Sequence, residues 1–298
     1  MRRLDRIVVG IDFTEPSMDA LRWSTTHLAP DGRQMLAHVV EPAEGPGFLV
    51  PPQNLANIGD AVAVAASGTR LREVARDFPG ALSTHVLVGL PSEELVRFAR
   101  REGAGLVVVG ACGESRPDKE WLGSTAERLA GAAPPPVLIV RRAPTGPPRQ
   151  ILVAVDDAAI TRTVLSWAAF LSERFAAELT LLHVLPNAAI THVASLAAAT
   201  SREVGASERE VEHALITEGA RWLESMALAG ANPQAVRTDI RFGRAGDVII
   251  ERASALPAHL LVIGRHGRTA IHPTRLGRTV RSVLHGATCP VLVVGADE

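Results

Sequence analysis

The chain has very few lysines and cysteines, and each shortage argues against a class of chemistry. Lys119 is the only lysine among 298 residues, so most of the chain lacks the residue that grips phosphate in a Walker loop or forms a Schiff base. The two cysteines, Cys112 and Cys289, do not make a disulfide framework or a four-ligand zinc site. They fit a reducing compartment best, and we therefore expect a cytoplasmic protein.

The sequence also lacks an excess of charge and any long apolar run. Its formal net charge is −1, so there is no global field to attract nucleic acid or an anionic membrane. No stretch approaches the about 18 apolar residues that a membrane helix needs, and Asp12 interrupts an N-terminal apolar run too short for a secretory signal. We therefore expect neither nucleic acid nor a membrane as a partner.

The chain contains an internal repeat, in which one sequence pattern occurs twice. The matched pairs are RIVVGID at 6–12 with QILVAVD at 150–156, LAHVV at 36–40 with LLHVL at 181–185, and PVLIV at 136–140 with PVLVV at 290–294. Such self-similarity predicts two tandem domains, 1–143 and 149–298, joined by the linker APTGPPR at 143–149. The offset grows from 144 residues at the first pair to 154 at the glycine-rich segments. We expect the extra residues to lengthen a loop and helix within 194–229.

Each half is expected to alternate strands with helices. In the first half the apolar runs predict strands at 6–11, 33–40, 82–88, 106–109 and 137–140, with helices near 18–28, 58–76, 92–102 and 124–129. This order predicts an α/β fold, namely two tandem doubly wound domains, each with a five-stranded parallel sheet. Ligands of such sheets bind at the carboxyl ends of strands, at a topological switch point. Asp12, Val39 and Gly110 fall at such ends.

A glycine-rich segment follows the fourth strand of each half. Its glycines are Gly110, Gly113 and Gly123 in the first half and Gly264, Gly267 and Gly277 in the second. Glycine lets backbone amides point at an anion without steric cost. Ser124 to Glu127 fits the S-x-x-E capping box of a helix whose unpaired amides would face the loop. The pattern favours phosphate binding over the ordinary alternatives, which are tight turns, close helix packing and a plain N-cap at Ser124.

The spacing G-x2-G-x9-G-[ST] after an apolar strand resembles the ATP-binding motif of the universal stress protein family. The first half matches it without a gap through Ser124, whereas the second half has Arg278, followed by Thr279, where the family has Ser or Thr. The resemblance implies an adenine nucleotide α-hydrolase-like fold, ATP with or without Mg²⁺ as the ligand, and a nucleotide-responsive stress regulator rather than an enzyme. The positions so assigned to the nucleotide are Asp12, Val39, Gly110, Gly113, Gly123, Ser124, Thr125, Asp156, Val184, Gly264, Gly267, Gly277, Arg278 and Thr279.

The resemblance also gives roles to the ends of the first two strands. It places the acidic residue, Asp12 or Asp156, against adenine and ribose, and the backbone at Val39 or Val184 on the adenine edge. IDFT at 11–14 is similar to the family signature, whereas VDDAA at 155–159 has Ala158 in place of the hydroxyl residue. The ordinary alternatives are helix capping for the aspartates and plain sheet positions for the valines.

The two glycine-rich loops differ in charge. The second carries Arg265, Arg268, Arg275 and Arg278, and the first carries Glu114, Asp118 and Glu120. Guanidinium groups pair well with phosphate, so charge favours the second loop, although an arginine run is more often a solvated face. Cap chemistry favours the first loop, which we expect to be the working site, with the second an altered site. The spacing of His259, His266 and His272 matches no zinc motif, and we assign no metal site.

Two other functions make different demands on the sequence. An ATP-cleaving enzyme would need groups that position the substrate and stabilise charge, but the sequence has no SGG-x-DS loop, HIGH-type histidine pair, Walker lysine or obvious magnesium cluster. We therefore assign no catalytic residue and leave slow hydrolysis open. A nucleotide-free interaction scaffold would make the glycine loops purely structural.

Family members pair through the last strand, which implies an intramolecular pseudo-dimer through Val137–Val140 and Val291–Val294. A homodimer and an unidentified regulatory protein are the further expected partners.

Overall fold

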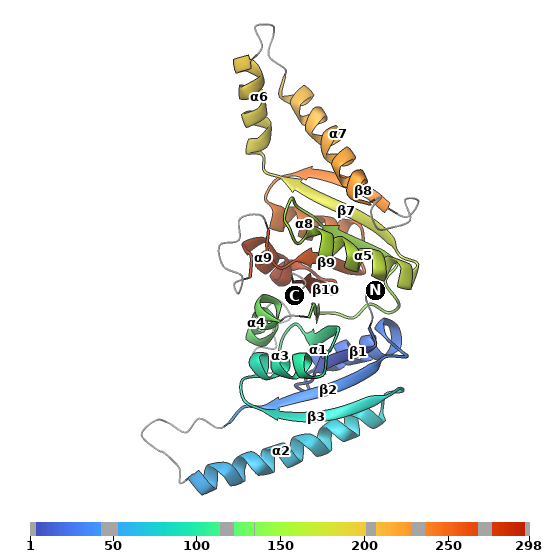
Figure 1. Ribbon diagram of the computed structural model, residues 1–298, viewed down its shortest axis with the longest axis vertical. Coiled ribbons are helices and arrows are strands. Elements are labelled where there is room, and N and C mark those ends of the chain that lie inside the picture. The colour runs from blue at the N-terminus through green and yellow to red at the C-terminus, as the bar shows by residue number, and fades with distance from the viewer. Residues whose placement is uncertain are drawn as a thin grey trace. The chain divides into compact units, whose positions relative to one another are not determined.

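The computed structural model describes residues 4–42, 53–113, 122–133, 135–200, 207–227, 236–267 and 276–295. The chain divides into two compact units, the first formed mainly by residues 1–147 and the second mainly by residues 148–294. Figure 1 draws the first unit from blue to green and the second from yellow-green to red. Each unit is one parallel sheet with helices packed against it.

The first unit has five strands in the order β3-β2-β1-β4-β5, and every neighbouring pair is parallel. Its elements are β1 (Arg6–Gly10), α1 (Glu15–Trp23), the π-helix η1 (Ser24–Leu28), β2 (Arg33–Val40), α2 (Gln53–Arg76), β3 (Leu82–Val88), α3 (Pro91–Arg101), β4 (Leu106–Gly110), α4 (Ser124–Ala132) and β5 (Val137–Val140). The chain moves outward from β1 to β3 and then returns to β4, so the switch point lies between β1 and β4.

The second unit repeats this order as β8-β7-β6-β9-β10, again all parallel. Its elements are β6 (Gln150–Ala154), α5 (Thr161–Phe175), β7 (Glu178–Leu185), α6 (Ala188–Thr200), α7 (Glu208–Ala227), β8 (Val236–Phe242), α8 (Ala245–Ala255), β9 (Leu260–Gly264), α9 (Arg278–Gly286) and β10 (Val291–Val294). The predicted fold class, two doubly wound domains with five-stranded parallel sheets, is confirmed.

The central strands are continuous apolar runs because helices cover them on both faces. In β1, Ile7, Val8 and Val9 have no exposed surface, and all four residues of β5 are buried. Helix α1 packs against β1, β4 and β5, whereas α3 packs against β1, β2 and β3 and against α4. Right-handed crossovers place α1 and α3 on opposite faces of the sheet, so the first sheet forms the middle layer of three.

The helix expected at 18–28 differs at both ends. It begins at Glu15 because Pro16 suits the first helical turn, and from Ser24 onward it widens into η1. The side chain of Gln34 stabilises this wider turn by donating from Nε2 to Ser24 O at 3.2 Å and to Ala29 O at 3.0 Å, both buried. Nothing in the local sequence indicates this contact, because Gln34 comes from the next strand.

Two other helices are longer than expected. Helix α2 begins at Gln53 rather than near Ile58, and α4 continues to Ala132 rather than ending at Leu129. Ala133, which follows α4, has extended backbone angles of φ −68° and ψ 132°. The steric restriction that prolines place on the residues before them accounts for this end.

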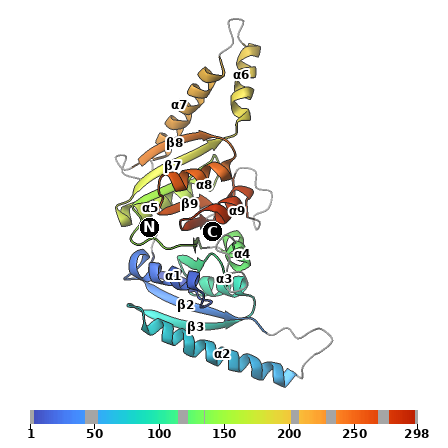
Figure 2. The ribbon, with the colours of Figure 1, turned by 180° about the vertical axis from the view of Figure 1, so that it is seen from behind.

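The insertion in the second half provides an additional helix. Where the first unit has α2 between its second and third strands, the second unit has both α6 and α7. Helix α7 packs against β7 and β8 and also against α6, and Figures 1 and 2 both show α6 and α7 projecting beyond the sheet of their unit. Within the described ranges, no helix is long and apolar enough to cross a membrane.

Candidate functional site

An aspartate and a glycine meet at the switch point of each unit. Asp12 follows β1 and Gly113 follows β4, and a Cβ built on Gly113 would lie 2.8 Å from Asp12 Oδ2. The second unit repeats the contact, since a Cβ on Gly267 would lie 2.7 Å from Asp156 Oδ2. Side chains do not approach so closely, so glycine is what lets each loop backbone pass beside the carboxylate.

The carboxylate of Asp12 closes a short turn. Its Oδ1 accepts from the backbone N–H of Thr14 at 3.1 Å and from Thr14 Oγ1 at 2.5 Å. Phe13, between them, has a left-handed φ of 63°. Because Oδ1 is used in this Asx turn, and the N-cap of α1 is Thr14, Asp12 is not the helix cap that the ordinary alternative proposed. Its Oδ2 faces Gly113.

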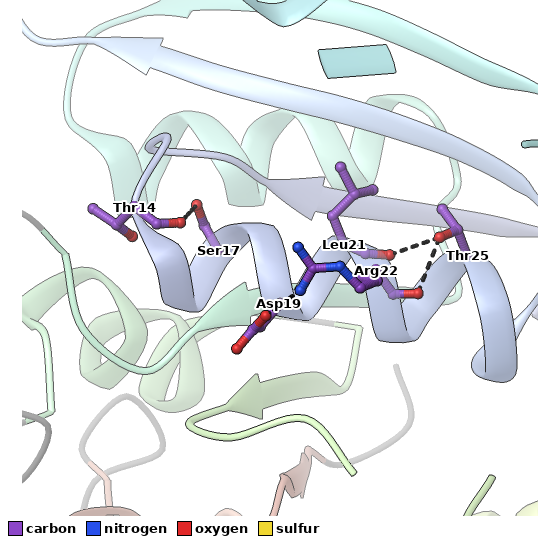
Figure 3. Close-up of polar contacts among 6 residues, drawn as sticks. All are labelled: Thr14, Ser17, Asp19, Leu21, Arg22 and Thr25. Carbon is purple, nitrogen blue, oxygen red and sulfur yellow. Dashed lines mark hydrogen bonds and ion pairs between the residues drawn. The ribbon is translucent and has the colours of Figure 1, made fainter. Parts of the chain in front are cut away.

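The first turn of α1 is fixed by its own polar side chains. Ser17, which is 2% exposed, donates from Oγ to Thr14 O at 3.0 Å, and Figure 3 shows this bond beside the Asp19–Arg22 ion pair on the same helix. Farther along, Thr25 Oγ1 donates to the carbonyl oxygen of Leu21 at 3.0 Å (Figure 3). The start of α1 therefore holds the Asp12 turn in place.

The glycine-rich loop is closed at its base. Gly123 N–H donates to Ala111 O at 2.7 Å, and Gly123 is the N-cap of α4 with φ −68° and ψ 146°. The predicted capping box is therefore wrong, because Ser124 is already helical and the cap position falls on a residue without a side chain. Among the described residues no side chain caps α4. Ser124 is exposed and Thr125 is half-buried at the start of the helix.

The second loop closes in the same way. Gly277 N–H donates to Arg265 O at 3.3 Å, and Gly277 is the N-cap of α9 with φ −62° and ψ 149°. Arg278 therefore stands in the first helical position, exposed, with the half-buried Thr279 after it. The departure from the motif changes the side chain at this helix end and leaves the backbone geometry unchanged.

Gly110 has a packing role of its own. A Cβ there would lie 2.8 Å from Ser17 N and 2.9 Å from the carbonyl carbon of Pro16, both backbone atoms of α1. The corresponding Cβ on Gly264 would meet a side-chain methyl, Ile160 Cγ2, at 3.0 Å. Close helix packing thus accounts for Gly110, whereas Gly113 and Gly267 are accounted for by the approach to an aspartate.

The second strand of each unit ends beside the aspartate. Ile11 N–H donates to Ala37 O at 2.9 Å and Val155 N–H donates to Leu182 O at 3.0 Å. This pairing puts the half-buried Val39 at the end of the strand beside the one that leads into Asp12, and likewise Val184 beside the strand that leads into Asp156. The structure therefore brings together the predicted aspartate, valine and middle glycine in each unit.

Aromatic contacts at these strand ends were missed by the sequence analysis. The Phe13 ring lies 4.6 Å from the His38 ring, and the Arg70 guanidinium of α2 lies 4.1 Å from the Phe13 centroid. In the second unit the neighbour of the histidine is Trp222 of α7, whose ring lies 5.0 Å from that of His183. The available signal was the histidine repeated in LAHVV and LLHVL.

Half-buried arginines follow the fourth strand of the second unit and the last strand of the first. Burial lowers the pKa of Arg265, which follows β9, and likewise the pKa of Arg141, which follows β5. Five other charged loop residues and His272 lie outside the described residues. The five are Arg268, Arg275, Glu114, Asp118 and Glu120. Within the described ranges no group of three or more His, Cys, Asp or Glu is placed to hold a metal ion.

The shared strand order and the repeated aspartate–glycine contact define a tandem α/β protein with one candidate ligand site at the carboxyl edge of each sheet. The sequence profile described as "Universal stress protein family" matches residues 3–141 and 148–295. The chain therefore belongs to the universal stress protein family.

Among its relatives, one matches about half of the chain and another nearly all of it. A universal stress protein of Mycolicibacterium smegmatis is 31% identical over 148 residues, which is 50% of this chain and 48% of that relative, so the match spans about half of its length. A universal stress protein of Mycobacterium tuberculosis H37Rv is 23% identical over 302 residues, covering 98% of this chain and 97% of the relative. A solved universal stress protein of Archaeoglobus fulgidus, 18% identical, covers 99% of this chain and 98% of its own with a TM-score of 0.65, which supports the fold.

Proposed function

We propose that this universal stress protein binds ATP at the carboxyl edge of the first unit and acts as a nucleotide-responsive regulator. The observation that carries the proposal is the Asp12–Gly113 contact beside the start of α4, a helix without a side-chain cap among the described residues. Free amides at a helix N-terminus and the positive end of its dipole favour phosphate. The hydroxyl of Ser124 stands at the same helix end.

The nucleoside half of ATP fits the other side of this site. The Asp12 carboxylate would accept hydrogen bonds from ribose hydroxyls, and the backbone at Val39 lies on the adjacent strand to meet the adenine edge. The triphosphate would carry any Mg²⁺ with it. Gly123 is consistent with this arrangement, because its described surroundings do not require a glycine. Its φ of −68° suits any residue, and a Cβ built there would lie 3.4 Å from Ala111 O, which is an ordinary contact distance. An approaching ligand would explain why glycine stands there.

We propose that the second unit is an altered nucleotide site. Arg278 places a cation at the N-terminus of α9, where the helix dipole opposes it. An anionic ligand at this helix end would interact favourably with both the guanidinium and the amides. The hydroxyl of Thr14 has no counterpart at Ala158, so the bond from Thr14 Oγ1 to the aspartate is not repeated in the second unit.

Thermal unfolding with and without excess Mg-ATP tests the proposal. A ligand at about 100 times its dissociation constant stabilises the folded state by about 2.7 kcal/mol. We expect the wild type to show such a shift and Gly123→Val to lose the part of it that the first site contributes. Gly277→Val reports the second site separately, and Gly146→Val is the matched control, because a Cβ on Gly146 meets nothing within 4 Å.

Two results would contradict the proposal. An unchanged unfolding temperature of the wild type in Mg-ATP would favour the nucleotide-free scaffold. Steady ATP turnover on the order of 1 per second or faster, lost in Gly123→Val, would make the protein an enzyme rather than a binding regulator.

A further inference from the structure

A histidine in each unit holds the backbone that leads into the site aspartate. His38 Nδ1 lies 2.7 Å from Ile11 O, and His183 Nδ1 lies 2.8 Å from Val155 O. The accepting carbonyl belongs in both cases to the residue directly before the aspartate. A carbonyl oxygen can only accept, so Nδ1 must carry the proton and, in the neutral ring, Nε2 is the unprotonated nitrogen.

The peptide between Ile11 and Asp12 is held at both ends. Its carbonyl accepts from His38, and its N–H, on Asp12, donates to Ser17 Oγ at 3.4 Å. In the second unit the carbonyl before Asp156 accepts from His183, and the carbonyl of Asp156 itself accepts from Thr161 Oγ1 at 2.5 Å. The helix-side partner thus differs between the units, whereas the histidine contact is the same in both.

This arrangement determines where the carboxylate lies. The space between the Asp12 carboxylate and Gly113 is too small for a methyl group, since a Cβ built on Gly113 would lie 2.8 Å from Oδ2. A rotation of the preceding peptide would move the carboxylate either into the loop or away from it. The histidine bond opposes this rotation, and the half-buried ring is itself fixed by its aromatic neighbour, Phe13 or Trp222.

We propose that His38 and His183 are positioning residues, each of which orients the aspartate of its own unit toward the nucleotide by donating Nδ1–H to the preceding carbonyl. The proposal rests on the proposed ATP site. It assigns the histidines no contact with the ligand.

Paired substitutions at one position separate the hydrogen bond from the ring. His38→Asn loses the ring and its contact with Phe13 but keeps an N–H donor close to the place of Nδ1. His38→Leu loses both the ring and the donor. We expect His38→Leu to bind ATP about tenfold more weakly than His38→Asn, the upper range for one buried hydrogen bond, in titration calorimetry with Mg-ATP. His38→Gln moves the amide toward the place of Nε2 and should behave as His38→Leu does.

The measurements are made in the Gly277→Val background, so that only the first site contributes. If His38→Leu does not fold, the comparison of His38→Asn with His38→Gln carries the test. A second readout is the tautomer, since the histidine ¹⁵N spectrum of the folded protein should show protonated Nδ1 and unprotonated Nε2 in the neutral rings of His38 and His183.

The outcomes are distinguishable. Equal ATP affinity in His38→Leu, His38→Gln and His38→Asn, with normal wild-type binding, overturns the positioning role and leaves the ATP site standing. An Nε2-protonated neutral tautomer overturns it as well. Absence of ATP binding in the wild type overturns the proposed function and this inference with it.

Discussion

The two units place the corresponding carboxylate beside turns of different sequence. In the first unit Asp12 is held by Thr14, and α1 begins directly afterwards at Glu15. In the second unit, Ala158 replaces the hydroxyl residue and α5 begins later, at Thr161. A Cβ built on the middle glycine would nevertheless lie at nearly the same distance from the carboxylate, 2.8 Å in the first unit and 2.7 Å in the second. Thus this contact does not depend on the threonine.

The units also differ in what lies beside the second strand. In the first unit Phe13 packs beside His38, and the Arg70 guanidinium lies over the Phe13 ring, whereas in the second unit Trp222 packs beside His183. Trp222 comes from α7, which is part of the region enlarged by the insertion. The backbone frame of the site is therefore duplicated, and the side chains around it have diverged. Three experiments test how far the two units differ.

The largest difference is expected for the first glycine of each motif. Gly110→Ala places a Cβ against backbone atoms of α1, which cannot yield, whereas Gly264→Ala meets a methyl group that can shift. Overpacking against fixed neighbours costs about 2–3 kcal/mol of unfolding free energy, and we expect about 1 kcal/mol for Gly264→Ala. Hydrogen exchange of the amides in β4 and β9, read by mass spectrometry, measures each unit separately. Equal losses in the two variants would contradict the distinction.

The next effect concerns Cys289, at the position that corresponds to Pro135 of the first unit. Burial raises the pKa of the Cys289 thiol from 9.0 to about 11. At pH 8 the folded thiolate fraction should therefore be roughly a hundredfold below that of the unfolded chain. This difference is measured by the rate at which iodoacetamide alkylates Cys289 in the Cys112→Ser variant, compared between the folded protein and the protein unfolded in guanidinium.

The sign of the pH dependence follows from the same shift. The folded state keeps the proton to higher pH than the unfolded state, so this thiol's contribution to stability is complete below pH 9.0 and is lost as the pH rises toward about 11. Cys289→Ala should remove that part of the alkaline loss. Equal alkylation rates in the folded and unfolded protein would show that burial does not raise the pKa of Cys289.

The smallest effect is expected for the hydroxyl that distinguishes the two turns. Thr14→Ala removes the Oγ1 bond to Asp12 but leaves the backbone bond, so ATP affinity of the first unit should fall only about threefold to fivefold. Ala158→Thr is the reciprocal change and should strengthen binding in the second unit by no more than this. Titration calorimetry in the Gly277→Val and Gly123→Val backgrounds isolates the two sites. A complete loss of binding in Thr14→Ala would show that the hydroxyl, and not the glycine contact, places the carboxylate.

The repeat, the strands, the fold class and the family can all be predicted from the amino-acid sequence. These follow from apolar runs and glycine spacing, which are local and occur twice, so each half corroborates the other. The aspartate and the middle glycine were also identified, because strand ends of a parallel sheet converge on one edge.

The role of each of these residues, by contrast, depends on the tertiary structure. In the sequence the three motif glycines look equivalent. In the structure, however, Gly110 must be glycine because α1 packs against it, and Gly113 because the Asp12 carboxylate lies beside it. Neither the φ of Gly123 nor its described neighbours require a glycine at that position. The π-helix depends on Gln34 of the next strand, and the role of His38 depends on a carbonyl 27 residues away along the chain. Such assignments are set by distances between segments far apart in sequence, and a local pattern contains no information about those distances.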